Sequence, residues 1–407
     1  MSNLKPILLD KLEKISNILS ENYNTNEHVG VLSGISGIAL FQFYYSKFIE
    51  KESHADIGVE MISSVIEKIN EGYSFPTFCT GIAGAGWAIE LLDEEGFIDV
   101  DSDDLLSDLD DYLSLATKQM GEKDNFYDFL HGAIGIGFYF FKRYKGTKST
   151  ALKNDYKIKL LEIVASLKKS YIEEDDKIKW ESNLNEKEEL RGYNLSLSHG
   201  MASIINFLSR LAMYDDFYDE VTPMLYKATQ FILSNEDKDV SSSSMFPSWV
   251  YDGMDKKSNE RLAWCYGDLG IGLTLWKAGK VLRDEKVIQK GMNTVKNSCK
   301  RRDLEETKVR DNGLCHGTFG MVQIYNYMYK ETKELIFKET ADYWMEQGLK
   351  MDTHTDGYVG YKQWYGGEKE GWRNEMNLLE GIAGIGLCII SYLAPFETKW
   401  DECLLIS

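Results

Sequence analysis

Apolar residues along the chain recur at helical spacing, as in Leu8, Leu12, Ile15 and Leu19 near the amino terminus. Residues three and four positions apart share one face of a helix, so this pattern predicts amphipathic helices. The alternation of apolar and polar residues that is typical of strands is nearly absent. We therefore expect an all-α protein.

A short glycine motif repeats through the chain. The pattern Gly-x-x-Gly, followed by small or apolar residues, begins at Gly34, Gly81, Gly132, Gly267, Gly317 and Gly381. A seventh copy, at 200–203, has Ser203 in place of its second glycine. The first glycines lie 47 (from 34 to 81) to 68 (from 132 to 200) residues apart, a length that suits a helical hairpin with loops. We predict seven hairpins, each with one glycine-started inner helix and one outer helix, stacked as an open solenoid or closed into a ring.

Three long connections interrupt the repeats, at about 174–193, 236–260 and 352–375, and each precedes a glycine motif. The first could form a small insertion. We expect the connections at one end of the bundle, where their aromatic residues would either grip a peptide or pack their own loops. These residues are Phe246, Trp249, Tyr251, Tyr358, Tyr361, Trp364, Tyr365 and Trp372.

The composition of the chain limits which classes of partner it can bind and in which cellular compartment we expect it. The formal net charge of −19 disfavours binding to nucleic acid or to an anionic membrane surface. The six cysteines are too widely spaced for an extracellular disulfide framework, which favours a reducing compartment. We see no signal peptide and no apolar run of about 20 residues, so we expect a cytoplasmic protein without direct membrane insertion.

Two cysteines stand at equivalent positions of successive repeats. Cys265 lies two residues before Gly267, and Cys315 lies two residues before Gly317, with His316 directly after it. Two thiols and an imidazole are donors that zinc favours, so these three residues are our candidate metal site. Cys79 has the same position in the second repeat but no adjacent ligand, and we interpret it as a core thiol.

Other polar and aromatic residues stand close to the same level of their repeats: Asp128, His199, Arg261, Trp264 and Tyr266. We expect His131 to be a helix-start residue, because its neighbours Phe129 and Leu130 look like core. His199 is a stronger candidate, since Asp128 in the neighbouring unit would fix its tautomer for proton transfer.

These residues lead to a family resemblance. The strings Trp-Cys-Tyr-Gly at 264–267, Cys-His-Gly at 315–317 and Ser-His-Gly at 198–200, set among seven glycine hairpins, resemble the lanthionine synthetase C-like family. That family contains the cyclases of class I lanthipeptide biosynthesis. The resemblance covers nearly all of residues 1–407 and implies one α/α-toroid domain of seven inner and seven outer helices, with longer loops at its active-site end. It also implies one zinc ion per chain.

The resemblance implies a reaction as well. Cys265, Cys315 and His316 would hold the zinc, and a peptide cysteine would add to a dehydroalanine or dehydrobutyrine of the same peptide. The resemblance implies further roles for five residues. His199, oriented by Asp128, would supply the proton to the α-carbon. Arg261 would stabilise the enolate, Tyr266 would help to position or protonate that enolate, and Trp264 would shape the wall that contacts the substrate. The substrate is then a dehydrated precursor peptide, while participation of a dehydratase and an exporter stays open.

Three other functions stay open. A related enzyme would add glutathione to a dehydrated residue of a protein. A binding scaffold would use zinc for structure alone and would need a fourth protein ligand, for which Asp268 and His199 are the options. A carbohydrate-processing toroid would need paired carboxylates, and Asp128 with Glu380 is the obvious pair.

Overall fold

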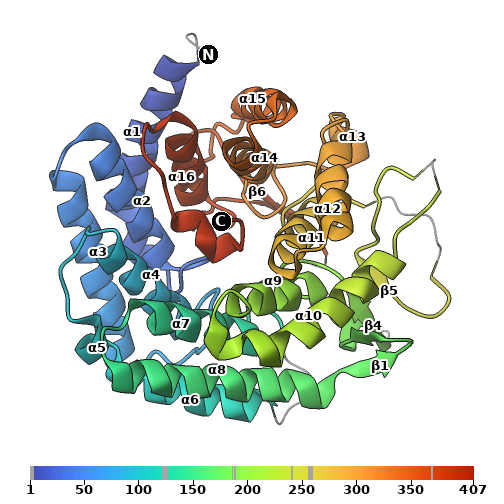
Figure 1. Ribbon diagram of the computed structural model, residues 1–407. Coiled ribbons are helices and arrows are strands. Elements are labelled where there is room, and N and C mark those ends of the chain that lie inside the picture. Colours follow the sequence, from blue (N-terminus) through green and yellow to red (C-terminus); the bar gives the residue numbers. More distant parts are fainter. Residues whose placement is uncertain are drawn as a thin grey trace. The chain divides into compact units, whose positions relative to one another are not determined.

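The computed structural model describes residues 4–121, 127–185, 187, 189–239, 242–254, 260–367 and 370–407. Parts of all three predicted long connections, at 186, 188, 240–241, 255–259 and 368–369, lie outside these described residues. The elements, which Figure 1 labels and colours along the sequence, belong to two compact units. The first unit comprises the chain up to Leu109 together with Arg310–Ser407, and the second comprises Asp110–Val309.

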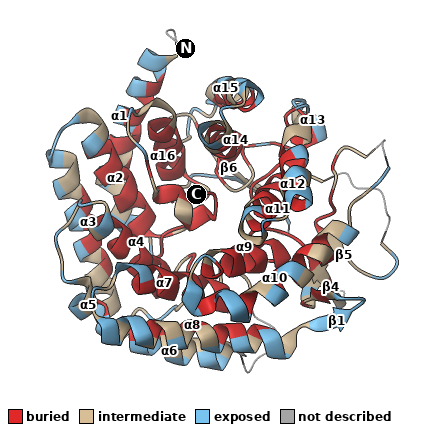
Figure 2. Ribbon diagram, in the orientation of Figure 1, coloured by how far each residue is buried: buried red, intermediate tan, exposed pale blue. Residues whose placement is uncertain are grey.

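The first unit is built around four inner helices that follow motif glycines: α2 (Ile35–Ile49), α4 (Ile82–Glu94), α14 (Thr318–Thr332) and α16 (Ile382–Leu393). Its remaining elements are α1 (Lys5–Asn22), η1 (Tyr23–Thr25), α3 (Ser53–Asn70), α5 (Ser102–Leu105), α15 (Leu335–Lys350), β6 (Gln363–Tyr365), β7 (Gly371–Arg373) and η2 (Trp400–Leu404). Helix α16 packs between α14 and α2, and α2 packs on α4. The inner helices are buried on nearly every face (Figure 2), as expected for helices that are apolar all round.

The second unit holds the other three inner helices: α7 (Ala133–Gly146), α9 (Met201–Leu211) and α11 (Asp268–Leu282). Their outer partners are α8 (Thr150–Ser170), α10 (Asp215–Ser234) and α12 (Glu285–Ser298), and α9 contacts both α7 and α11. Helix α6 (Ser107–Gly121) begins in the first unit and ends in the second, and α13 (Leu304–Thr307) follows α12. All seven predicted inner helices thus begin at the predicted glycines.

The outer helices show the amphipathic pattern that the sequence predicts. In α1, Leu8, Leu12, Ile15 and Leu19 have no exposed surface. Polar residues of α1 such as Asp10 are exposed. The apolar stripe therefore packs inward, while the charged face meets solvent.

Glycine permits the close packing of the inner helices. A Cβ atom at Gly386 would lie 2.3 Å from the ring of Phe41 in the neighbouring helix α2. Since real Cβ atoms essentially never come within 3.0 Å of another heavy atom, a larger residue would force the ring of Phe41 or the two helices to shift.

Two departures from the repeat differ in their effect on the backbone. Ser203, which replaces the second glycine of the fourth motif, donates its hydroxyl to the carbonyl of Gly200 at 2.7 Å, and α9 begins as its counterparts do. Gly267 instead adopts a φ of +84°, a conformation that favours glycine, whereas the other six first glycines have extended backbone. The unusual turn therefore precedes α11, next to Cys265.

The long connections contain short strands, which differs from the nearly strand-free chain that the sequence predicts. In the second unit, β1 (Ile172–Glu174) pairs with β2 (Lys177–Lys179), and a further sheet has the order β3 (Ser182–Asn185), β4 (Leu190–Asn194), β5 (Trp249–Val250). In the first unit, β6 pairs with β7. All the pairs are antiparallel. Strands of two to five residues are too short to leave a period of alternation in the sequence.

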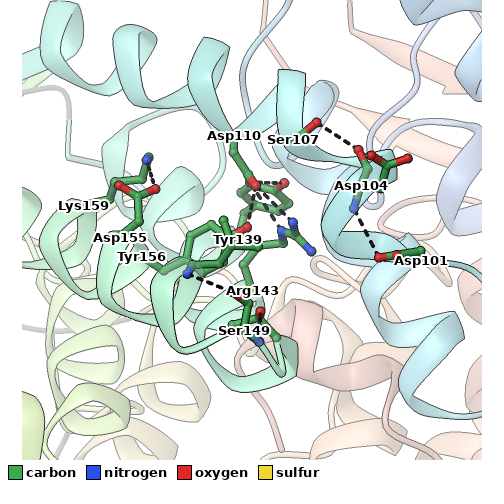
Figure 3. A network of polar contacts seen from close by, with 12 residues as sticks. Asp101, Asp104, Ser107, Asp110, Tyr139, Arg143, Ser149, Asp155, Tyr156 and Lys159 are labelled. Carbon is green, nitrogen blue, oxygen red and sulfur yellow. Dashed lines mark hydrogen bonds and ion pairs between the residues drawn. The ribbon is translucent and has the colours of Figure 1, made fainter.

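A buried ion pair ties the start of the second unit together (Figure 3). Asp110 of α6 accepts hydrogen bonds from the hydroxyls of Tyr139 and Tyr156, each at 2.6 Å, and from Nη2 of Arg143 at 3.0 Å. Arg143 has no exposed surface. One carboxylate thus joins α6, α7 and α8, and the two hydroxyls help to compensate for its removal from water.

Among the described residues, no helix combines the length and the apolar character needed to pass through a membrane.

Candidate functional site

The turns that precede the inner helices are joined by backbone hydrogen bonds. In the first unit, the carbonyl of Leu379 accepts bonds from the N–H groups of Leu314 (2.9 Å) and Cys315 (3.0 Å). The N–H of Leu379 donates in turn to the carbonyl of Leu32 at 2.8 Å. These bonds hold the residues ahead of three motif glycines in corresponding positions.

The second unit repeats this pattern around Cys265. Its carbonyl accepts hydrogen bonds from the N–H groups of Leu197 (3.1 Å) and Ser198 (3.4 Å) in the turn before α9. Corresponding positions of the fourth and fifth repeats are therefore neighbours, as the sequence register predicts.

The structure brings Asp128 and His199 together, as predicted. Nδ1 of His199 lies 3.5 Å from Oδ2 of Asp128. The other carboxylate oxygen of Asp128 accepts the backbone N–H groups of His131 and Gly132 at the start of α7, so the carboxylate is fixed by main chain. An anion facing Nδ1 favours the tautomer with the proton on that atom, which leaves Nε2 as the nitrogen for proton exchange.

Burial and neighbouring charges shift the pKa values of Asp128 and His131. Burial raises the pKa of Asp128, but the hydrogen bond and charge of His199 and the backbone N–H of His131 outweigh it, so the pKa is lowered. Burial lowers the pKa of His131, with Asp128 opposing and His199 reinforcing this shift. The site therefore holds an anionic Asp128 and a neutral His131 at neutral pH.

A cavity of about 400 Å³ in the second unit is lined by Asp128, His199 and Tyr266, and the sheet β3-β4-β5 forms much of its wall. The ring centroid of Tyr266 lies 6.2 Å from that of His199 and 6.3 Å from that of Trp249. Three of the four predicted catalytic residues thus share one cavity.

Arg261 and Trp264 lie outside the lining of this cavity. Arg261 is exposed, in a segment held by a bond from the buried Arg301 to the carbonyl of Glu260 at 2.6 Å. Trp264 has no exposed surface, whereas Trp180 and Trp249 line the cavity. The predicted roles of Arg261 at the enolate and of Trp264 at the substrate stay predictions.

In the first unit, a buried carboxylate orients His316. Oδ2 of Asp311 lies 3.2 Å from Nε2 of His316. Asp311 is held by the backbone N–H groups of Gly313 (3.1 Å) and Trp364 (3.2 Å). A carboxylate at Nε2 places the proton there and makes Nδ1 the nitrogen suited to a metal, an arrangement common among metal-binding histidines.

A second acidic cluster lies in the same unit. The hydroxyl of Tyr365 donates to Glu380 (2.5 Å) and to Glu375 (3.0 Å), and Asn377 donates to Glu375. Burial raises the pKa of both glutamates, while the hydrogen bond from Tyr365 opposes the shift. Glu380, considered above as half of a carboxylate pair with Asp128, is therefore already engaged by Tyr365.

Asp311 and Glu375 were not among the site residues predicted from the sequence, although their positions relative to the motif glycines could have indicated them. They stand six residues before Gly317 and Gly381, the position that Arg261 holds before Gly267. Applying the register of Arg261 to the later repeats would have identified both.

Cys265, Cys315 and His316 form the group of described residues that could hold a metal ion. All six cysteines of the chain carry thiols and none is in a disulfide; Cys265 is buried and Cys315 is partly exposed. Two thiols and an imidazole oriented by Asp311 are a donor set that fits zinc.

Comparisons with known proteins cover nearly the entire chain. A family model described as Lanthionine synthetase C-like protein matches residues 27–405. Nisin biosynthesis protein NisC of Lactococcus lactis subsp. lactis is 23% identical over 419 residues, which cover 95% of this chain and 90% of NisC. The solved structure of a nisin cyclase matches with a TM-score of 0.75 and 19% identity, over 100% of this chain and 98% of that one. This likeness confirms the predicted fold class, an α/α toroid of helical hairpins.

Proposed function

Because the chain belongs to the lanthionine synthetase C-like family, whose model spans residues 27–405, we propose that it is a class I lanthipeptide cyclase. The family match is the observation that carries this proposal, and the similarity to NisC over 95% of the chain supports it. We propose that residues 1–407 act as a single cyclase domain. Its substrate is a precursor peptide that contains cysteine and dehydrated serine or threonine.

The reaction is an addition without a leaving group. The sulfur of a peptide cysteine bonds to the β-carbon of a dehydroalanine or dehydrobutyrine in the same peptide. The thiol loses a proton, the α-carbon gains one, and a thioether ring closes. Because both reacting groups belong to one peptide, an enzyme that holds them together gains mainly from proximity and proton transfer.

One zinc ion per chain would be held by Cys265, Cys315 and His316. These three donors leave one of zinc's usual four positions for substrate. When bound, zinc lowers the pKa of a coordinated thiol, so that the peptide cysteine is present as a nucleophilic thiolate at neutral pH. Asp311 supports this assignment, because its carboxylate fixes the ring of His316 from the opposite nitrogen.

His199 supplies the proton for the α-carbon in our proposal. Its contact with the anionic Asp128 at 3.5 Å orients the ring, and both side chains line the cavity. A positioned general acid commonly contributes about 10²–10⁴-fold in rate.

The other candidate residues act near the negative charge that develops on the dehydro residue during the addition. Tyr266 lines the cavity with His199 and assists at the enolate. Arg261 stabilises the negative charge on the carbonyl oxygen of the dehydro residue. Trp264, which has no exposed surface, shapes the wall of the site.

Partners follow from the chemistry of the substrate. Dehydroalanine and dehydrobutyrine arise by loss of water from serine and threonine, so a peptide dehydratase must act before this enzyme. We propose that the enzyme works in the cytoplasm, where its thiols stay reduced, alongside this dehydratase and a peptide exporter at the membrane.

The proposal is tested with purified protein and a dehydrated peptide that contains cysteine. Ring formation consumes thiols without changing the mass, so the product resists alkylation by iodoacetamide in mass spectrometry. A parallel incubation with glutathione and a dehydrated peptide lacking cysteine tests for addition of a small thiol. Rings in the first reaction support the cyclase, whereas glutathione adducts alone would assign the related activity, and no reaction in either would favour a zinc-stabilised scaffold.

A further inference from the structure

Asn194 holds the same position of its repeat as Arg261. Asn194 lies six residues before Gly200, and Arg261 lies six residues before Gly267. Arg261 is the residue to which we assign stabilisation of the enolate, but it lies outside the lining of the cavity, whereas Asn194 is part of that lining. The fourth repeat therefore places a polar side chain of this position inside the cavity.

The side-chain amide of Asn194 is held in one orientation. Asn194 is the last residue of β4, and its Oδ1 accepts the backbone N–H of Ser196 at 3.0 Å. Because an N–H group only donates, this bond identifies Oδ1 as the oxygen and Nδ2 as the other amide atom. The hydroxyl of Ser196, which is fully buried, accepts the backbone N–H of His199 at 3.1 Å. Ser196 thus positions both Asn194 and the start of the His199 side chain.

The amide nitrogen of Asn194 is an oriented donor that lacks an acceptor. Asn194 is only 7% exposed, and Nδ2 has no hydrogen-bond partner among the residues that the structure describes. Nδ2 is also not sealed from solvent, unlike the unpartnered buried atoms elsewhere in the chain. Since Asn194 borders the cavity, this donor is available to a group that enters it.

The proposed reaction develops negative charge on an oxygen atom. As the sulfur bonds to the β-carbon, the electron pair of the double bond between the α- and β-carbons moves toward the carbonyl oxygen of the dehydro residue. The α-carbon then takes a proton, and the carbonyl is restored. A donor that is already oriented toward this oxygen stabilises the transition state more than the substrate, and a neutral amide does so without transferring a proton.

On the basis of the proposed function, we propose that Nδ2 of Asn194 donates a hydrogen bond to the carbonyl oxygen of the dehydroalanine or dehydrobutyrine. Asn194 is then a catalytic residue of ring closure in addition to Arg261. The segment 194–199 would carry both the donor to the oxygen and, in His199, the proton donor to the α-carbon. Tyr266, which lines the same cavity, would act beside them.

The first experiment removes the donor and keeps the turn. Asn194→Asp retains the oxygen that accepts the N–H of Ser196 but lacks the amide protons, and it should lower the single-turnover rate of ring closure by about 10²–10³-fold. Asn185→Asp is the matched control, because Oδ1 of Asn185 accepts the N–H of Lys187 at 3.1 Å in the same way and Asn185 lies outside the cavity lining. It should stay within about threefold of the unmodified rate. Equal rates of the two variants would contradict the proposal.

Peptide affinity separates stabilisation of the transition state from substrate binding. The probe is a peptide that keeps its dehydroalanine but carries serine in place of cysteine, and calorimetry measures its binding to the zinc-loaded enzyme. Asn194→Asp should weaken this binding by less than about threefold, because the charge on the oxygen develops only during the reaction. A loss of affinity as large as the loss of rate would overturn the proposal.

Two further measurements keep the test decisive. Asn194→Ala removes the donor without adding a charge, and its rate should fall by about the same factor as that of Asn194→Asp. If neither variant folds, the unmodified enzyme is tested with a peptide whose dehydroalanine carries a thioamide in place of its carbonyl. Because sulfur accepts hydrogen bonds weakly, the acceleration over uncatalysed closure should fall by about tenfold or more. An unchanged acceleration would overturn the proposal.

The cysteine peptide with its ordinary carbonyl separates this proposal from the function on which it rests. Rings formed at equal rates by the unmodified enzyme and by Asn194→Asp would remove only the role of Asn194. Absence of rings with the unmodified enzyme would remove the cyclase itself, and the role of Asn194 with it.

Discussion

Cys315 and Cys79 occupy the same position of two repeats, and the comparison between them isolates the metal site. Each lies two residues before a motif glycine, but Cys315 precedes His316, whereas Cys79 precedes Thr80 and contacts Ser33 at 3.3 Å. We expect Cys315→Ala to lose most of the bound zinc, because it removes a thiolate donor, and Cys79→Ala to keep about one zinc per chain. Elemental analysis of the purified variants measures this. Equal zinc content in the two would contradict the assigned site.

His199 and His131 form a second matched pair. Each lies one residue before a motif glycine, and their rings stack at 6.2 Å. His199→Asn should keep zinc and lower the rate of ring closure by about 10²–10⁴-fold, since the proton donor is lost. His131→Asn should stay within a few-fold of the unmodified rate, because Asp128 contacts its backbone and not its ring. Similar rates for the two variants in the alkylation assay would remove His199 from the mechanism.

Asp268 gives the second unit a pH dependence. It has no exposed surface and accepts the backbone N–H groups of Met245 and Phe246, and burial raises its pKa to about 6 from 3.8. The folded chain therefore holds a proton that the unfolded chain releases. The stability that this proton contributes is complete below about pH 4 and is lost as the pH rises through about 6.

Asp268→Asn tests this dependence, because asparagine does not titrate. With both proteins stripped of metal, the stability of the unmodified chain relative to the variant should fall by about 3 kcal/mol between pH 4 and pH 7. Urea unfolding at each pH measures the difference. A difference that stays constant across this range would show that Asp268 does not titrate as assigned.

The candidate site residues were predicted from their positions relative to the motif glycines. That criterion explains which residues of the site were predicted and which were missed. Cys265, Cys315 and His316 were found because they stand directly ahead of motif glycines. The contact between Asp128 and His199 was predicted from neighbouring repeats, and the structure confirms it. Asp311 was missed because the position six residues before a motif glycine was applied to Arg261 alone, and its contact with His316 became visible only in the structure.

At the scale of elements, the carboxylate of Asp110 joins three helices of the second unit. Asp110→Ala would leave Arg143 buried without its counter-ion, and we expect it to lower the free energy of unfolding by about 3–5 kcal/mol. Asp104→Ala is the control, because Asp104 is exposed in α5, and it should change stability by less than about 0.5 kcal/mol. Urea unfolding followed by circular dichroism measures both, and similar losses would show that the network does not stabilise the chain.

Helices could be predicted from sequence far better than strands. In the sequence, a glycine followed by a long apolar run indicates an inner helix, as in α16. Apolar residues at helical spacing indicate an outer helix, as in α1. The strands lie in loops and gain their order from pairing, as Trp364 does with Trp372 across β6 and β7. Such pairing depends on how the loop closes, and it produces no regular alternation of apolar and polar residues in the sequence. The positive φ of Gly267 was equally hidden, because its motif reads like the others.

At the scale of the whole molecule, periodicity established the number of hairpins but left an open solenoid and a closed ring as alternatives. The match to the nisin cyclase structure over 100% of the chain resolves this in favour of the toroid class. The physical reason for the ambiguity is that each hairpin buries its apolar faces against its neighbours in either arrangement. The local pattern is then the same, and the difference lies in the small angle between repeats.

The central claim is that this chain closes thioether rings with the help of zinc held by two thiols and an imidazole. The most direct measurement counts the cysteines of a dehydrated peptide that resist alkylation after incubation with the enzyme, before metal removal, after it, and after zinc is restored. We predict that ring formation is lost on removal by a chelator and recovered with one equivalent of zinc per chain. Rings formed at an undiminished rate by the metal-free protein would contradict the account.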